Sequence, residues 1–234
     1  MSLKKISLLF LSFIAFSCAE LQQVVDSLPN ENGGTLDIAG GLRQALDFGI
    51  DKQVTKLTQK DGFYKNSLVK ILLPEELRKV DKALRNIGLS SLADEGLKVL
   101  NRAAEDAVKE ATPIFVSAVK SITFTDAKNI LLGNDKAATN YLQSRTNQAL
   151  YNKFNPVIKN SFGKVGADDI WANIINKYNS IPFVNKVNPD LTDYVTQQAL
   201  KGVFTMIAVE EKKIRNNINS RTTTLLQKVF ALQD

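Results

Sequence analysis

Apolar side chains recur at steps of three and four residues along almost the whole chain, and this spacing constrains the fold more than any other feature. Such spacing places the apolar residues on one face of an α-helix. The pattern is clearest between residues 97 and 122, where it comprises Leu97, Leu100, Ala104, Ala107, Ala111, Ile114, Ala118 and Ile122. The alternation typical of a strand is not convincing anywhere, and only residues 69–73 are ambiguous. We therefore predict an all-α domain with about eight to ten helices and at most one short extended segment at 69–73.

Glycine, proline and capping residues predict where the first helices begin and end. A helix is expected from Asp37 to the break at Asp61-Gly62, and Pro74 is placed to open the next one, with Glu75 and Glu76 in its first turn. Small residues in the 97–122 stripe predict the close approach of a neighbouring helix. Pro113 should kink or divide that helix, because proline lacks the backbone N–H group.

Capping signals continue through the second half of the chain. Thr123-x-x-Asp126 predicts a capping box for a helix that ends at Gly133. Asn134 or Asp135 should cap a helix that meets Pro156, and Asn188-Pro189-Asp190 should start the last long helix, with a short terminal helix over 225–232.

The N-terminus has the layout of a bacterial export signal. Lys4 and Lys5 precede an uncharged apolar run of residues 6–16, which is too short for a comfortable membrane span of about 20 residues. Ala15-Phe16-Ser17 leads into Cys18, as in the lipid-modified N-terminus of bacterial lipoproteins. The alternative is an ordinary cut after Ser17 that leaves a free thiol. We predict a lipoprotein-type signal at 1–17, lipidation of Cys18 and location in the bacterial cell envelope, anchored to a membrane and facing the periplasm.

The remaining sequence predicts one domain that is stable without a disulfide. Cys18 is the only cysteine in the chain, so the core alone must stabilise the fold. Residues 18–36 include the turn-forming run Pro29-Asn30-Glu31-Asn32-Gly33-Gly34 and resemble a tether. The predicted organisation is therefore a signal at 1–17, a tether at 18–36 and a helical domain at 37–234.

The charge of the chain favours no particular macromolecular partner. Lys4 and Lys5 belong to the signal, so residues 18–234 hold 28 basic and 24 acidic residues and a net charge of +4. The basic residues are spread along the chain, whereas a nucleic-acid surface needs a dense basic stripe. We expect no nucleic-acid partner, and a membrane partner through acylated Cys18.

The absence of histidine excludes several kinds of chemistry. Serine and cysteine hydrolase triads, His general bases, His-containing zinc sites and helical di-iron sites all need imidazole. Phosphate-binding glycine loops and calcium loops are also missing from the sequence. We therefore expect no metal or cofactor, and any catalysis would depend on carboxylates, Lys, Tyr, Ser or Thr.

Two polar clusters remain as candidate sites. Residues 101–105 include Asn101, Arg102 and Glu105 beside the buried stripe, and i,i+4 spacing predicts pairs of Arg102 with Asp106 and of Glu105 with Lys109. The structural interpretation is a set of surface pairs with one interfacial Asn; the functional one is a polar site.

The second cluster lies near the end of the last long helix. Glu210 and Glu211 continue an apolar stripe, so at least one should point inward, and Arg215 is placed to pair with Glu211. Arg221 or Arg102 could supply further partners. A structural ion network and a polar site with a perturbed carboxylate are both open interpretations.

The chain resembles a bacterial family known as domain of unknown function 4197 over residues 41–230. The matching blocks are Gly41-Leu42-x-x-Ala45-Leu46, Asp61-Gly62-Phe63, Lys70-Ile71-x-Leu73-Pro74, Asn101-Arg102-Ala103-Ala104-Glu105-x-Ala107, Asp126-Ala127-x-x-Ile130-Leu131-x-Gly133, Ala137-Ala138-Thr139-x-Tyr141-Leu142, Tyr194-Val195, Gly202-x-Phe204 and Glu210-Glu211-x-x-Ile214-Arg215. The resemblance implies a mainly helical exported protein without an assigned activity. It also implies that a site would be sought at Asn101, Arg102, Glu105, Asp126, Glu210, Glu211, Arg215 and Arg221.

Three functions are compatible with these features. The first is a non-catalytic, lipid-anchored helical protein that binds an envelope partner. The second is a carrier that holds an apolar ligand between helices. The third is an enzyme that uses Glu105, Glu210 or Glu211 as acid or base.

Overall fold

The computed structural model describes residues 37–73, 78, 82, 85–86, 88, 90–180, 182–183, 185–188 and 190–233. The predicted export signal, the lipidation at Cys18, the tether at 18–36 and the helix start at 74–76 lie outside these residues.

Every regular element in the described part of the chain is helical, which confirms the predicted all-α fold. The helices are α2 (Ile38–Thr58), α4 (Ser90–Val108), α5 (Ala111–Lys120), α6 (Phe124–Leu131), α7 (Ala137–Gly163), α8 (Ala167–Asn179), α9 (Leu191–Asn216), the 3-10 helix η3 (Ile218–Ser220) and α10 (Thr224–Phe230). The ambiguous run at 69–73 belongs to an irregular connection between α2 and the following segment, and no strand occurs in the described residues.

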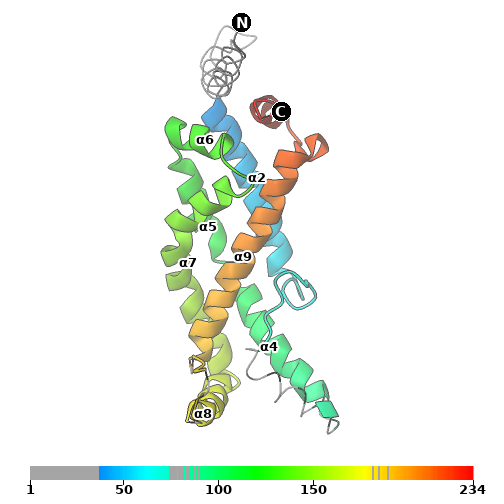
Figure 1. Cartoon of the computed structure of the whole chain (residues 1–234), viewed down its shortest axis with the longest axis vertical. Coiled ribbons are helices and arrows are strands. Elements are labelled where there is room, and N and C mark those ends of the chain that lie inside the picture. The colour runs from blue at the N-terminus through cyan, green and yellow to red at the C-terminus, as the bar shows by residue number, and fades with distance from the viewer. Residues whose placement is uncertain are drawn as a thin grey trace, which may run out of the picture.

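The two longest helices form the axis of an elongated bundle. α7 has 27 residues and α9 has 26, and they pack side by side in opposite directions (Figure 1). α2 and α4 both pack on α9, while α5 packs between α2 and α7. α6, the start of α2, the end of α9 and α10 gather at one end, here named the α10 end, and α8 lies at the other (Figure 1).

Large buried side chains along α7 and α9 hold this axis together. α7 places Leu150, Phe154 and Ile158 at i,i+4 steps, and all three are inaccessible to solvent. Phe204 on α9 meets Phe115 on α5 edge to face, with ring centroids 6.0 Å apart. Burial of each such side chain contributes about 1.5–3 kcal/mol, so apolar packing explains why these helices stay together without a disulfide.

Close contacts at two glycines fix the positions of the shorter segments. A Cβ atom on Gly202 of α9 would lie 2.6 Å from the ring of Phe63, which is fully buried in the connection after α2. A Cβ on Gly41 would lie 2.5 Å from Val229 of α10. Any larger residue would displace these side chains, so the glycines allow the connection and α10 to pack directly on helices α9 and α2.

Proline has different consequences at its two helical positions. Pro113 is the third residue of α5, and the helix breaks between Val108 and Ala111, so the predicted division is confirmed. Pro156 lies inside α7, and the prediction that this helix meets it as a boundary was wrong. Ile158 and Phe162, which follow Pro156, are fully buried, and their packing offsets the missing hydrogen bond.

The start of α9 also differs from the prediction. Asp190 is the N-cap, and its side chain accepts a hydrogen bond of 2.8 Å from the N–H of Asp193. Asn188, the first residue of the predicted helix start, instead accepts from the N–H of Asp190 in the turn before the helix. After the end of α9, Asn217 caps η3 by accepting a hydrogen bond of 3.0 Å from the N–H of Asn219.

Candidate functional site

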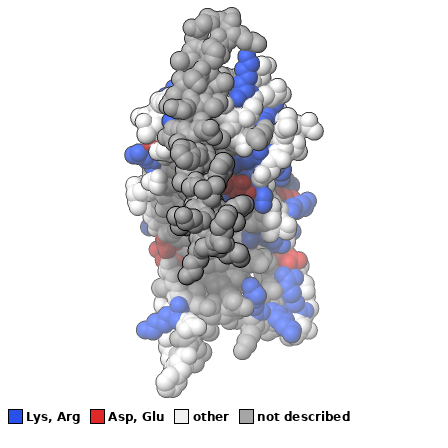
Figure 2. Space-filling view, turned by 45° about the horizontal axis from the view of Figure 1, so that its top comes forward, with Lys and Arg blue, Asp and Glu red and all other residues white. Residues whose placement is uncertain are grey.

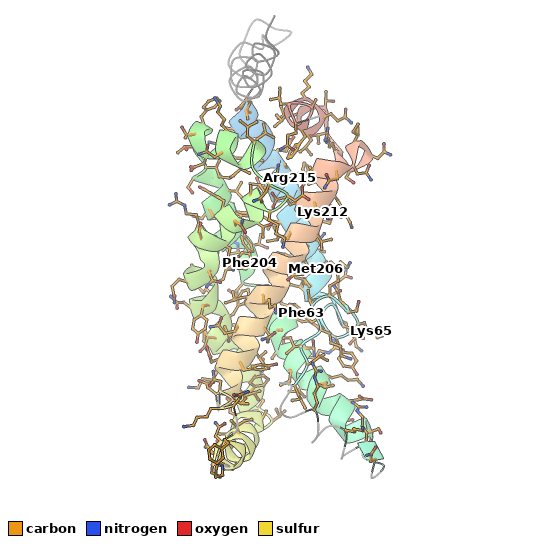
Figure 3. The ribbon with its side chains drawn as sticks, in the orientation of Figure 1. Phe63, Lys65, Phe204, Met206, Lys212 and Arg215 are labelled. Atoms are coloured by element: carbon orange, nitrogen blue, oxygen red, sulfur yellow. The ribbon has the colours of Figure 1, made fainter. Side chains whose placement is uncertain are left out.

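The eight predicted polar residues do not form one site. Figure 3 shows Arg215 near the α10 end of α9 and Phe63, whose N–H binds Glu105, further along the bundle, with Met206 between them. Glu211, Arg215 and Arg221 belong to one group, which we name the Glu211 cluster. Asn101, Arg102 and Glu105 belong to another, named the Glu105 cluster, while Glu210 and Asp126 make separate contacts.

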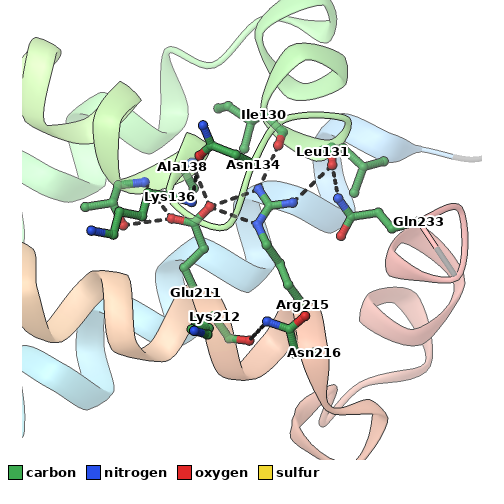
Figure 4. Close-up of polar contacts among 11 residues, drawn as sticks. Ile130, Leu131, Asn134, Lys136, Ala138, Glu211, Lys212, Arg215, Asn216 and Gln233 are labelled. Atoms are coloured by element: carbon green, nitrogen blue, oxygen red, sulfur yellow. Dashed lines mark hydrogen bonds and ion pairs between the residues drawn. The ribbon is translucent and has the colours of Figure 1, made fainter. Parts of the chain in front are cut away.

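Glu211 caps α7 from the neighbouring helix α9. Its carboxylate accepts hydrogen bonds from the N–H of Ala138 at 2.9 Å and from the N–H and hydroxyl of Thr139 at 2.8 and 2.7 Å (Figure 4). The residue at the N-cap position, Lys136, makes no side-chain capping bond. A carboxylate on the free N–H groups and positive dipole end of a helix is stabilised by both. Glu211 therefore caps α7 in place of Asn134 or Asp135, the residues that the sequence predicted as its cap.

Arg215 joins this carboxylate to the end of α6. Its guanidinium donates two hydrogen bonds to Glu211, at 3.0 and 2.9 Å, and others to the carbonyls of Ile130 and Leu131 (Figure 4). The Glu211 and Arg215 side chains are 6% and 5% exposed, so the pair is buried. This confirms the predicted pair and the inward direction of Glu211. The arrangement satisfies free groups at the start of one helix and the end of another.

Arg221 satisfies free carbonyl groups at the end of α9. It is buried and donates hydrogen bonds to the carbonyls of Ile214 and Arg215, which are among the last residues of α9. Its guanidinium and that of Arg215 both lie about 6 Å from the ring of Phe230 in α10. Arg221 thus connects α9 to α10.

Glu210 contacts α2 beside a small pocket. Its carboxylate accepts hydrogen bonds from Lys52 and, at 2.8 Å, from the amide of Gln53. The cavity between α2, α9 and α10 has a volume of about 30 Å³ and a mostly apolar lining that includes Leu46 and Ile207. One water molecule needs about 10–15 Å³, whereas ligand pockets have about 300–1,000 Å³. The interior next to the two glutamates therefore has room for water but not for a lipid.

Glu105 fixes the connection that follows α2. Its carboxylate accepts hydrogen bonds from the N–H groups of Phe63 at 3.1 Å and Asp61 at 3.3 Å, and from Arg102 at 3.2 Å. Asp61 has a φ of 68°, a left-handed conformation that is rare for residues other than glycine. The carboxylate therefore stabilises a tight turn that the backbone alone would not favour.

Arg102 pairs with Asp61 at 2.7 Å as well as with Glu105. The predicted pairs of Arg102 with Asp106 and of Glu105 with Lys109 were wrong: Lys109 pairs with Asp106, and the side chains of Arg102 and Glu105 turn toward the connection. A hydrogen bond from Lys65, together with the charge of Arg102, lowers the pKa of Asp61 below its ordinary value.

Asn101 holds the next part of the same connection. Its side-chain oxygen accepts from the N–H of Ile71 at 2.8 Å, and its amide donates to the carbonyl of Ile71 at 2.9 Å. A further bond of 2.7 Å reaches the carbonyl of Leu97 one turn earlier in α4. Asn101 is completely buried, and it satisfies both the backbone N–H and the C=O of Ile71, which would otherwise be buried without partners.

Asp126 belongs to a capping box at the start of α6, as predicted. Its side chain accepts from the N–H of Thr123 at 3.0 Å, and its own N–H donates to the Thr123 hydroxyl at 3.1 Å. The bond from the Thr123 N–H, followed by the one from its hydroxyl, lowers the pKa of Asp126. Asp126 thus stabilises the helix start, and this contribution depends on its ionisation.

We expect Asp126→Asn to make stability less sensitive to acid. A carboxyl with a lowered folded-state pKa stabilises the fold above its ordinary pKa, and this contribution is lost as the pH falls through the lowered value. Between about pH 6 and pH 3, the melting temperature of Asp126→Asn should fall by less than that of the wild type. At about pH 6 the variant should melt at a lower temperature than the wild type, because it lacks the ionised carboxylate. Asp135→Asn, at an exposed acid nearby, is the control and should follow the wild type. Equal losses in Asp126→Asn and wild type would contradict this role.

Several residues that bind these polar side chains could not be identified from the sequence, because they are distant along the chain. Lys52, Gln53 and Asp61 lie on α2 or just after it, far along the chain from Glu210 and Arg102. The described residues contain no group of three or more acidic, Cys or His side chains that could hold a metal ion. None of the helices in that same part of the chain combines the length and the apolar character of a membrane span.

Comparison with known proteins identifies one family. The family described as "Protein of unknown function (DUF4197)" matches residues 33–231. No curated protein and no solved structure matches the chain.

Proposed function

The chain belongs to the DUF4197 family, and we propose that it is a non-catalytic, lipid-anchored helical protein that binds an envelope partner through its surface. The observation that carries the proposal is that the eight candidate polar residues form hydrogen bonds within the fold. Asn101, Arg102, Glu105, Asp126, Glu210, Glu211, Arg215 and Arg221 all bind groups within the fold.

These contacts disfavour the enzyme hypothesis. A general acid or base must reach the reacting group of a substrate, directly or through one water molecule. Glu211 accepts hydrogen bonds on both oxygens from backbone N–H groups, and Glu105 does the same. Both carboxylates are therefore used to hold segments of the chain in place.

The interior also disfavours the carrier hypothesis. The pocket beside Glu210 has a volume of about 30 Å³, and it is lined by side chains of α2, α7, α9 and α10. An apolar ligand would have to displace part of the core. Binding at the outer surface requires no such rearrangement.

The anchor is supported by the sequence and by the position of α2. Residues 18–36 separate Cys18 from the N-cap of the first described helix, Asp37. At about 3.3–3.6 Å per residue, these 19 residues could span at most about 68 Å. A tether of that length would leave the domain free to meet a partner beside the membrane.

Replacement of Cys18 by serine tests the anchor. Because stable anchoring requires acyl chains on Cys18, the wild-type chain expressed in bacteria should sediment with membranes, and Cys18→Ser should be released into the soluble fraction. Mass spectrometry of the N-terminal peptide should show an acylated Cys18. Ser17→Ala, which keeps a small residue before the cut, is the control and should stay with membranes. Unmodified Cys18 in the mature chain would contradict the anchor.

Chemical crosslinking in intact cells tests the partner. We expect a reproducible covalent adduct between the anchored chain and one envelope protein, identified by mass spectrometry. The repeated absence of any adduct would contradict partner binding.

A further inference from the structure

A polar groove on the outside of the bundle lies between α7 and α9. Its volume is about 320 Å³, within the range of ligand-binding clefts. Its lining includes Lys136, Asn140, Gln143, Asn147, Gln197 and Lys201.

Four amide side chains in this groove are not used by the fold. Asn140, Gln143 and Asn147 follow one another on α7 at steps of three and four residues, so they form a row along one face of that helix, and Gln197 lies opposite on α9. All four are exposed, and none of their side chains makes a hydrogen bond to the described residues. This contrasts with Asn101 and Gln53, whose amides bind other parts of the chain.

The charged residues that line the groove are both basic. Lys136 and Lys201 are exposed and make no ion pair within the described residues, and no acidic residue lines the groove. Figure 2 shows one face of the molecule, on which basic and acidic side chains both occur. The groove is therefore suited to a ligand with negative charges.

The two lysines lie toward opposite ends of the groove. Thr139 on α7 and Glu211 on α9 are at the same level, because they are hydrogen-bonded. Lys136 precedes Thr139 by three residues, and Lys201 precedes Glu211 by ten on the antiparallel helix. At a rise of about 1.5 Å per residue, the lysines are separated by about 15–20 Å along the bundle, which is five or six residues of an extended peptide at about 3.3 Å each.

The row of amides favours a peptide over a glycan or a nucleic acid. Each carboxamide carries a donor and an acceptor side by side, and these match the C=O and N–H groups of an extended backbone. Sugars and bases are usually held by exposed aromatic rings. The aromatic residue that lines this groove, Phe204, is 5% exposed and packs on Phe115.

We propose that this groove binds an extended peptide segment of a partner protein that carries two acidic residues five or six positions apart. The amides would bind its backbone, and Lys136 and Lys201 its carboxylates. The inference rests on the proposed function and names the part of the chain that a partner contacts.

The test measures binding of a fluorescein-labelled Gly-Ser peptide with two glutamates five positions apart to the full-length, detergent-solubilised chain. Fluorescence anisotropy should give a Kd about tenfold lower than for the same peptide with two glutamines. The double variant Lys136→Glu/Lys201→Glu should raise the Kd for the glutamate peptide by about tenfold or more and should favour a peptide with two lysines. The triple variant Asn140→Ala/Gln143→Ala/Asn147→Ala should also weaken binding, with the charges unchanged.

Lys212→Glu/Lys213→Glu is the matched control, because it makes the same change of net charge at exposed lysines outside the groove. It should leave the Kd within about twofold of the wild type. Equal effects of the two charge reversals, or no saturable binding to the wild type, would overturn the proposal. If the crosslinked adduct in cells survives Lys136→Glu/Lys201→Glu, the partner binds elsewhere: the groove proposal then fails, while the proposed function stands.

Discussion

Replacement of Arg215 by methionine should lower the free energy of unfolding by about 3–5 kcal/mol, the usual cost of removing one partner of a buried ion pair. The change leaves Glu211 buried without its guanidinium and leaves the carbonyls of Ile130 and Leu131 without their Arg215 donors. Methionine fills a similar volume, so the loss reflects the missing hydrogen bonds and charge more than a cavity.

Urea denaturation followed by circular dichroism measures this effect. Lys212→Met is the matched control, because Lys212 precedes Arg215 by three residues in α9 and is exposed; it should change stability by less than about 0.5 kcal/mol. A double-mutant cycle that combines Arg215→Met with Glu211→Leu should give a coupling energy of about 0.5–3 kcal/mol, since the two side chains are in contact. If Arg215→Met were as stable as the wild type, the Glu211 cluster would not be structural, and a binding or catalytic role would have to be considered again.

Replacement of Asn101 by leucine should also destabilise the protein strongly. It removes both partners of Ile71, whose N–H and C=O are held by the Asn101 side chain. A buried backbone group left without a partner costs about 1–3 kcal/mol, and here two groups are affected. The apolar volume of leucine offsets only part of that cost, because the two polar groups of Ile71 remain in place.

Hydrogen exchange locates the effect. The amide of Ile71 should lose its protection in Asn101→Leu, and the amides of α7 should keep theirs unless the whole chain unfolds. Asn129→Leu is the control, because Asn129 is an exposed helical asparagine of α6. Unchanged protection of Ile71 in Asn101→Leu would show that the connection after α2 is held by other contacts, such as the burial of Phe63 beside Gly202.

The sequence predicted the helices well because their signals are local. The three- and four-residue spacing of apolar residues gave the fold class, Thr123 and Asp126 gave the start of α6, and Pro113 gave the break before α5. The pair of Glu211 and Arg215 was also predictable, since both residues lie on one helix four positions apart. Pro156 was misjudged because a local rule was outweighed by packing that comes from other helices.

The contacts of the polar clusters were less predictable because most of them are long-range. The sequence near Arg102 offers Asp106 as a partner, but the side chain pairs with Asp61 in another segment and with Glu105. In the same way, the prediction that Asn134 or Asp135 caps α7 was wrong: the N-cap is Lys136, and the capping carboxylate comes from Glu211 on α9. Spacing along one helix can show that a carboxylate points inward, but it does not show which backbone N–H groups of other segments will donate to it.

The position of the cap of α7 also sets an order of events during synthesis. The first turn of α7 at Ala138 leaves the ribosome well before Glu211, which follows it by 73 positions. Until then its N–H groups bind water, and the helix lacks the anion that stabilises its start. The long axis of the bundle is therefore completed only when the last part of the chain arrives, so a nascent chain stopped before α9 would expose the apolar face of α7 to chaperones and proteases.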